Sequence, residues 1–68
     1  MTQAELAGLV ADGVLTSREA DAIFLHDVKG LSYRAIGLGL PVPVSAQAVH
    51  QRCRRGHDKI RLWRKEAA

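Results

Sequence analysis

The sequence predicts a single all-α domain over residues 1–68, with four helices and a helix-turn-helix in its second half. Apolar residues recur every three or four positions, which is the spacing of one helix face. Serine or threonine precedes each periodic stretch, where its side chain can accept a backbone N–H, and glycine follows the first two stretches. A chain of 68 residues forms a thin core and rarely builds a deep catalytic pocket, so we expect no enzymatic activity.

Two capping boxes predict the starts of the first two helices. Residues 2–5 have the sequence Thr-Gln-Ala-Glu and begin a helix over about 3–12 that ends at Gly13. Residues 16–19 have the sequence Thr-Ser-Arg-Glu and begin a second helix that ends at Gly30. The face that this second helix is expected to bury carries Ala20, Ile23, Phe24 and Val28.

A short third helix and a long fourth helix flank a connector that contains two prolines. Ser32 caps the third helix, in which Gly37 and Gly39 each cost about 1 kcal/mol relative to alanine and can let another backbone pack closely. Proline lacks a backbone N–H and restricts the preceding residue, so residues 41–44 (Pro-Val-Pro-Val) form the connector. Ser45 then caps the fourth helix, which covers about residues 46–64.

The fourth helix is amphipathic, with one apolar stripe and a basic outer face. Successive members of the stripe are four, three, four and three residues apart, and they are Val49, Cys53, Gly56, Ile60 and Trp63. Trp63 lies beyond the helix-turn-helix, where it packs either on the first helix or on a second subunit. Helix-turn-helix proteins often bind two DNA half-sites as dimers, and Ile60 and Trp63 are the candidate homodimer interface.

Charge is distributed unevenly between the two halves of the chain. Residues 1–30 contain two basic and five acidic residues, a net charge of −3, whereas residues 31–68 contain eight basic and two acidic residues, a net charge of +6. A basic half on a small domain is typical of proteins that bind polyanions such as nucleic acids. The alternative interpretation is a solvated basic helix that has no partner.

The order of polar side chains along the fourth helix fits insertion into the major groove of duplex DNA. The groove accepts one helix, and side chains in the first turns come closest to the base edges. Glutamine can bind adenine in a bidentate manner, whereas arginine and lysine further along the helix can bind phosphates. The predicted DNA-binding residues are Ser45, Gln47, His50, Gln51, Arg52, Arg54, Arg55 and Lys59.

Three segments resemble a known family of DNA-binding domains. They are residues 15–19 (Leu-Thr-Ser-Arg-Glu), residues 30–36 (Gly-Leu-Ser-Tyr-Arg-Ala-Ile), and Val44 and Ser45 followed by residues 49–52 (Val-His-Gln-Arg). In this order, over about residues 15–62, they resemble region 4 of sigma-70-type bacterial sigma factors and the helix-turn-helix of LuxR-type response regulators. The resemblance implies a recognition helix for the −35 promoter element, with Val49 as its first buried aliphatic residue. It also implies base contacts from Gln47, His50 and Gln51, and a backbone contact or a brace from Arg52.

The chain departs from the family pattern in three places. The distance from Ile36 to Val49 is two residues longer than the usual family spacing, so the turn before the recognition helix is not standard. Gly37 and Gly39 replace helix-forming residues of the family, and Gly56 is expected to interrupt the recognition helix. These departures predict an altered angle of the recognition helix.

We therefore predict a sequence-specific, duplex DNA-binding transcription regulator of bacterial or phage origin. The alternative is a sigma-like protein-interaction module that binds RNA polymerase or a host regulator through the acidic first half and the long connector. No apolar run approaches the roughly 18 residues of a membrane span, and no signal-peptide pattern occurs. The single cysteine, Cys53, cannot form an internal disulfide, so we expect a cytoplasmic protein without a membrane partner.

One spacing along the fourth helix resembles a metal-binding pattern, because His50, Cys53 and His57 follow one another at intervals of three and four residues. Three ligands on one helix do not converge on a tetrahedral ion, and Cys53 belongs to the apolar stripe. The sequence also shows no carboxylate pair, no phosphate-binding loop and no nucleophile beside a base. We therefore expect no metal, no cofactor and no catalytic residue.

Overall fold

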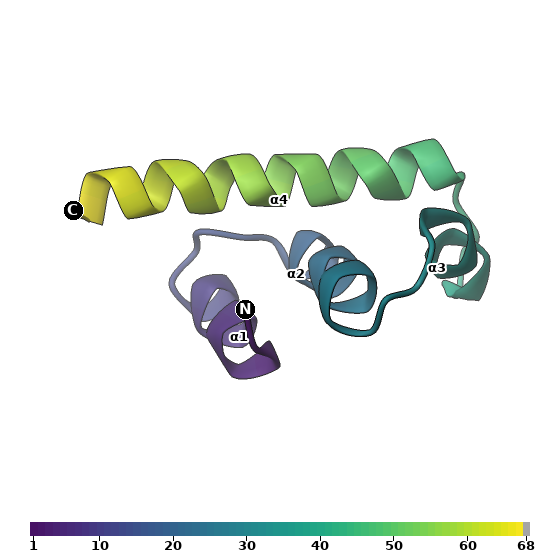
Figure 1. Ribbon diagram of the computed structural model, residues 1–68, viewed down its shortest axis with the longest axis horizontal. Coiled ribbons are helices and arrows are strands. Elements are labelled where there is room, and N and C mark those ends of the chain that lie inside the picture. The colour runs from purple at the N-terminus through teal and green to yellow at the C-terminus, as the bar shows by residue number, and fades with distance from the viewer. Residues whose placement is uncertain (68) are drawn as a thin grey trace.

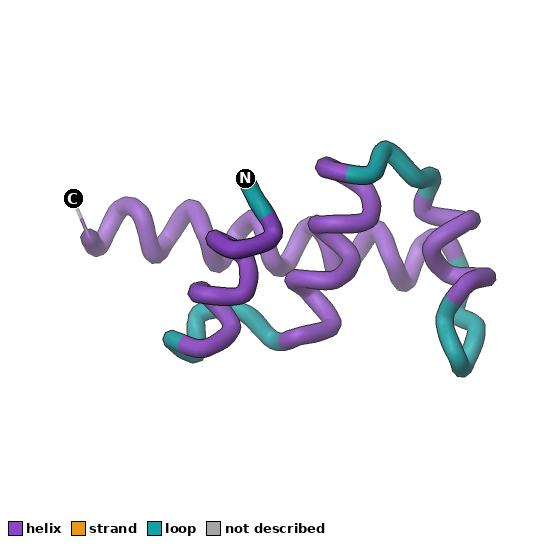
Figure 2. The backbone as a smooth tube through the Cα atoms, turned by 90° about the horizontal axis from the view of Figure 1, so that it is seen from below, coloured by secondary structure: helices purple, strands orange, loops and turns teal. Residues whose placement is uncertain are grey.

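Three short helices lie next to one another across one face of a long C-terminal helix (Figure 1) in the computed structural model, which describes residues 1–67. The elements are α1 (Gln3–Ala11), α2 (Ser17–Ile23), the π-helical turn η1 (Phe24–Val28), α3 (Tyr33–Gly39) and α4 (Ala46–Ala67). Figure 2 shows helices and loops and no strand over the described residues, which confirms the all-α prediction. Across residues 1–67, no helix combines the length and the apolar character that a membrane crossing needs.

Every α-helix begins directly after the cap residue that the sequence predicts. These cap residues are Thr2, Thr16, Ser32 and Ser45. At the start of α2, Thr16 Oγ1 accepts a hydrogen bond from Glu19 N at 3.2 Å, and Glu19 Oε1 accepts one from Thr16 N at 2.9 Å. This reciprocal pair satisfies two backbone donors that would otherwise have no partner. Gly13 and Gly30 follow the first and second helical segments with φ angles of 77° and 72°, which favour glycine.

The core consists of two apolar clusters on either side of α2. One cluster lies toward α1 and contains Leu6, Leu9, Leu15, Ala20, Ile23 and Ile60. The other lies toward α3 and contains Ala22, Ile36, Val49 and Cys53. The predicted stripe of α4 is therefore buried at Val49, Cys53, Gly56 and Ile60, whereas Trp63 keeps 39% of its surface exposed. This packing leaves the opposite side of α4 in solvent.

The second helix does not continue as a regular α-helix, and this changes which residues it buries. Over Phe24–Val28 the backbone widens into a π-helical turn, in which Lys29 N donates to Phe24 O at 3.1 Å. A π-turn contains more residues than an α-turn, so later side chains rotate away from the expected face. The prediction that Val28 is buried is consequently wrong, because Val28 is 48% exposed and Leu25 packs on the core instead.

Two glycines allow close contacts that any side chain would prevent. A Cβ atom on Gly37 would lie 2.3 Å from Val44 O, which confirms the expectation that another backbone packs on this residue. A Cβ atom on Gly56 would lie 2.5 Å from Ile23 Cδ1, so this glycine sets the distance between α2 and α4. The expected interruption at Gly56 is wrong, because α4 is continuous from Ala46 to Ala67. Here packing against α2 outweighs the weak helix propensity of glycine.

Gly37 and Gly39 lie in the same short helix and provide a matched pair of substitutions. Gly37→Ala should destabilise the fold by about 1–3 kcal/mol, because the added methyl group meets the backbone carbonyl of Val44. Gly39→Ala meets no atom within 4 Å and should be neutral or stabilise the fold by up to about 1 kcal/mol. Thermal denaturation followed by circular dichroism measures both changes. Equal melting temperatures for the two variants would contradict the close contact at Gly37.

Candidate nucleic-acid interface

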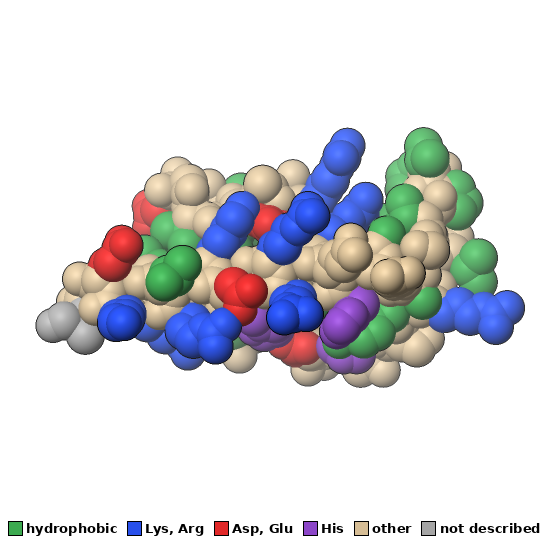
Figure 3. Space-filling model, turned by 90° about the horizontal axis from the view of Figure 1, so that it is seen from above, with side chains coloured by type: hydrophobic (Ala, Val, Ile, Leu, Met, Phe, Trp, Pro, Cys, Tyr) green, Lys and Arg blue, Asp and Glu red, His purple; other side chains and the backbone are tan. Residues whose placement is uncertain are grey.

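The outer face of α4 is a polar surface that runs along the whole helix. Its apolar stripe packs against α1, α2 and α3, so the opposite side chains point to solvent. Positions four, seven and eight residues apart share one side of a helix. The structure accordingly brings together four exposed predicted residues, which are Gln47, Gln51, Arg54 and Arg55. Figure 3 looks down on α4 and shows lysine and arginine side chains distributed along this face.

Ser45 fixes the start of α4. Its Oγ accepts a hydrogen bond from Ala48 N at 3.1 Å, so the side chain caps the helix. Ser45 is exposed, and its hydroxyl hydrogen can still be donated to another group. Because the cap defines the backbone of the first turn, Gln47 extends from a fixed position.

His50 lies on one flank of α4, where an aromatic stack holds it against α3. Its ring centroid is 5.0 Å from that of Tyr33, and the two rings are tilted by 54°. Tyr33 in turn stacks on His26 of η1, with centroids 4.0 Å apart. This contact restrains His50, whereas Gln47 and Gln51 extend into solvent without such a neighbour among the aromatic rings.

Arg52 lies on the other flank of α4, beside the first turn of α2, and Arg55 of the outer face borders this flank. They line a cleft together with Arg18 of α2, which was not among the predicted contact residues, and with Lys59. Glu19 also lines the cleft and pairs with Lys59, so Arg18, Arg52 and Arg55 give the cleft its net positive charge, which attracts anions. Arg18 was missed because it is far from α4 in sequence. The sequence signal that could have identified Arg18 is its position in the first turn of α2, two residues after the cap Thr16, where its side chain is exposed.

Lys59 is less available to an external anion than its sequence position suggests. Lys59 Nζ donates to Glu19 Oε1 at 2.8 Å, and the Glu19 side chain is only 8% exposed. Burial alone raises the pKa of the Glu19 carboxyl group. Hydrogen bonds from Lys59 and Thr16 outweigh burial, so the pKa lies below its ordinary value of 4.5. Lys59 therefore stabilises a buried carboxylate at the contact between α2 and α4.

Intramolecular contacts with aspartate also engage two side chains near the middle of α4. Arg61 donates a hydrogen bond to Asp58, one turn earlier on the same helix. His57 Nε2 lies 2.8 Å from Asp27 Oδ2 of η1. Within residues 1–67, no ion pair engages the arginines in the first half of α4, and these are Arg52, Arg54 and Arg55. The cationic groups nearest the helix start are thus available to an external anion.

The structure separates His50, Cys53 and His57, whose spacing resembles a metal-binding pattern. Cys53 is 3% exposed in the core, while His50 contacts Tyr33 and His57 pairs with Asp27. Burial raises the pKa of the Cys53 thiol, and the charge of Asp27 raises it further. Among the described residues, no three histidine, cysteine, aspartate or glutamate side chains come together as a metal site. Cys53 therefore serves as a small apolar core residue.

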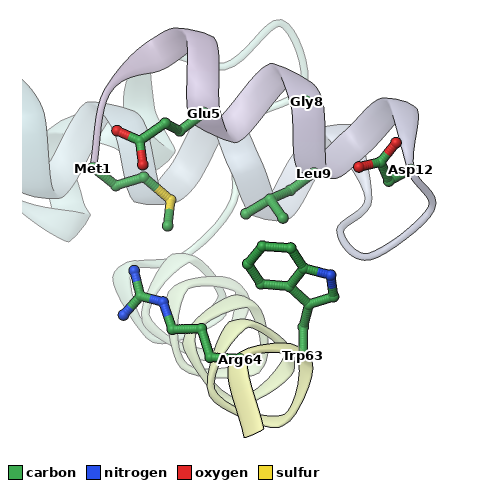
Figure 4. Close-up of a pocket in the computed structure, with 7 residues that line it drawn as sticks. All are labelled: Met1, Glu5, Gly8, Leu9, Asp12, Trp63 and Arg64. Carbon is green, nitrogen blue, oxygen red and sulfur yellow. The ribbon is translucent and has the colours of Figure 1, made fainter. Parts of the chain in front are cut away.

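Ile60 and Trp63, the expected homodimer interface, take different positions. Ile60 is 4% exposed and packs in the cluster with Leu6 and Leu9, so it belongs to the core of this chain. Trp63 lies under α1, with its indole beside Leu9 (Figure 4). Within the single chain, Trp63 thus lies against the first helix, and the homodimer contact stays a prediction.

Comparisons of this chain with known protein families, with curated proteins and with solved structures find no match. The features of α4 described above therefore provide the basis for a functional assignment.

The buried carboxylate of Glu19 should make stability depend on pH below about 4.5. Its pKa is lower in the folded chain than in the unfolded chain, so its contribution is complete above 4.5 and is lost as the pH falls through the folded value. Glu19→Gln should thus cost most stability near neutral pH, and the difference from the wild type should narrow near pH 3.

Urea denaturation near both pH values measures this difference, and the exposed Asp21→Asn on the same helix is the control for charge removal. A constant difference between the wild type and Glu19→Gln over this range would contradict the assigned role of Glu19.

Proposed function

We propose that this protein is a transcription regulator that binds duplex DNA in a sequence-specific manner by inserting α4 into the major groove. One observation carries the proposal: α4 buries an apolar stripe and presents glutamine and arginine side chains on the opposite, exposed face. A helix of this kind has the dimensions that the major groove accepts. The resemblance of residues 15–62 to region 4 of sigma factors supports the same assignment.

The charge of α4 supports a polyanionic partner. Its residues include seven lysines or arginines and two acidic residues, a net charge of +5, whereas the whole chain has +3. Such an excess on one exposed helix raises the rate of encounter with DNA and the affinity for phosphates.

The positions of the side chains suggest different roles in DNA binding. Gln47 and Gln51 lie in the first two turns of α4, which would come nearest the bases. Each glutamine can bind the Hoogsteen edge of an adenine. Arg54 and Arg55 follow on the same face and are assigned to phosphates. Arg52, with Arg18 beside it, is assigned to the phosphates of the strand that passes along the flank. His50 and Lys59 have secondary roles, because Tyr33 and Glu19 already engage them.

Selection from a pool of random duplexes by gel shift, at low and at high salt, tests the proposal directly. A consensus sequence should emerge, and the affinity for it should fall steeply with salt, by about 0.9 in log K per phosphate contact for each tenfold increase in salt. Salt-dependent binding without any consensus would contradict sequence-specific recognition. Absence of binding at low salt would contradict DNA binding itself and would favour the sigma-like protein-interaction module.

Two substitutions should change the binding of the selected duplex in different ways. Arg54→Ala should weaken binding to all sequences alike and reduce the salt slope by about 0.9, because it removes a phosphate contact. Gln51→Ala should relax the preference at one base pair, where the discrimination is about 1–3 kcal/mol. Fluorescence anisotropy with labelled duplexes measures both effects.

Lys29→Ala is the control, because it removes the same charge from the turn after η1, outside α4. If Arg54→Ala and Gln51→Ala bind as the wild type does, the proposed interface is wrong.

A further inference from the structure

The connector between α3 and α4 carries an apolar tip at the edge of the proposed DNA interface. Val42 is 78% exposed and is the most exposed large apolar side chain in residues 1–67. Leu38, near the end of α3, is 64% exposed. Figure 3 shows hydrophobic side chains gathered at this end of the molecule, beside the basic side chains of α4. Val42 and Leu38 thus place apolar surface directly next to the proposed DNA interface.

The connector is held in place, so its tip has a defined position. Val44 N donates to Gly37 O at 3.2 Å, and Val44 O lies where a side chain on Gly37 would be. Pro41 and Pro43, on either side of Val42, restrict the backbone further. The connector therefore loses little conformational freedom when a partner binds its tip.

A groove separates this tip from the first turn of α2. One wall consists of the connector, through Leu40, Pro41, Val42 and Val44, and the other wall consists of Arg18 and Arg52. No acidic residue lines the groove. The same two arginines also line the basic cleft beside α4, so the groove continues directly into the proposed phosphate-binding surface. Its walls thus combine apolar surface with two guanidinium groups.

We propose that this groove binds the sugar-phosphate backbone of one DNA strand as that strand passes the start of α4. The apolar face of a deoxyribose would pack on Val42, and the adjacent phosphates would accept hydrogen bonds from Arg18 and Arg52. This inference rests on the proposed function and adds a contact from outside α4. The occupant is DNA because the groove continues into the cleft that Arg52 and Arg55 of α4 line, and because its two guanidinium groups are complementary in charge to phosphate.

Charge substitutions at Val42 test the strand contact without disturbing the core. With the selected duplex as the probe, Val42→Glu should weaken binding by about fivefold, because a carboxylate would lie close to phosphates. Val42→Lys should strengthen binding and increase the salt slope by about 0.9. Val28→Glu and Val28→Lys are matched controls, because Val28 is a half-exposed valine on η1, outside the groove. Both control variants should change the affinity less than the Val42 variants do.

The outcomes separate this inference from the proposed function. If the wild type binds the duplex and both Val42 variants bind as their Val28 controls do, the strand contact is wrong and α4 remains the DNA-binding element. The apolar tip would then be assigned to a protein partner. If the wild type binds no duplex, both proposals are wrong. Circular dichroism of each variant confirms that the fold is retained.

Discussion

The packing of α4 on α2 is the contact on which the rest of the structure depends. Gly56 removes the side chain that would meet Ile23, so the two helices approach closely in the middle of the molecule. Beside this point, Lys59 binds the carboxylate of Glu19, which also closes the capping box of α2. One residue, Glu19, thus connects the start of α2 to α4, and its hydrogen bonds satisfy a charge that burial would otherwise destabilise.

This arrangement decides which side chains of α4 are available to a partner. Because the three short helices cover the stripe from Val49 to Ile60, the residues on the opposite face stay exposed, and these are Gln47, Gln51, Arg54 and Arg55. The same packing places Arg18 beside Arg52, and it places the connector at the N-terminal end of α4. The fold therefore gathers cations from two helices and an apolar loop around the first turns of one helix.

Much of the fold could be predicted from the sequence, because it depends on local signals. The four caps and the stripe of α4 are set by residue types at fixed spacing, and the structure confirms all four caps and four of the five stripe positions. Tertiary contacts could not be predicted in this way. The ion pair that engages Lys59 and the proximity of Arg18 to Arg52 arise between residues far apart in the chain. The π-turn that exposes Val28 is local, but it departs from the regular α-helical spacing on which the prediction relied. The sequence predicted the candidate face of α4, but it could not identify which of its cations the fold itself uses.

An NMR titration of the uniformly ¹⁵N-labelled chain with a duplex obtained by selection tests the central claim most directly. The account predicts that the largest changes in backbone amide and side-chain signals occur at Gln47, Gln51, Arg54 and Arg55, while Leu6, Leu9 and the indole of Trp63 change little. Changes centred on α1 and Trp63, or none on the outer face of α4, would contradict it.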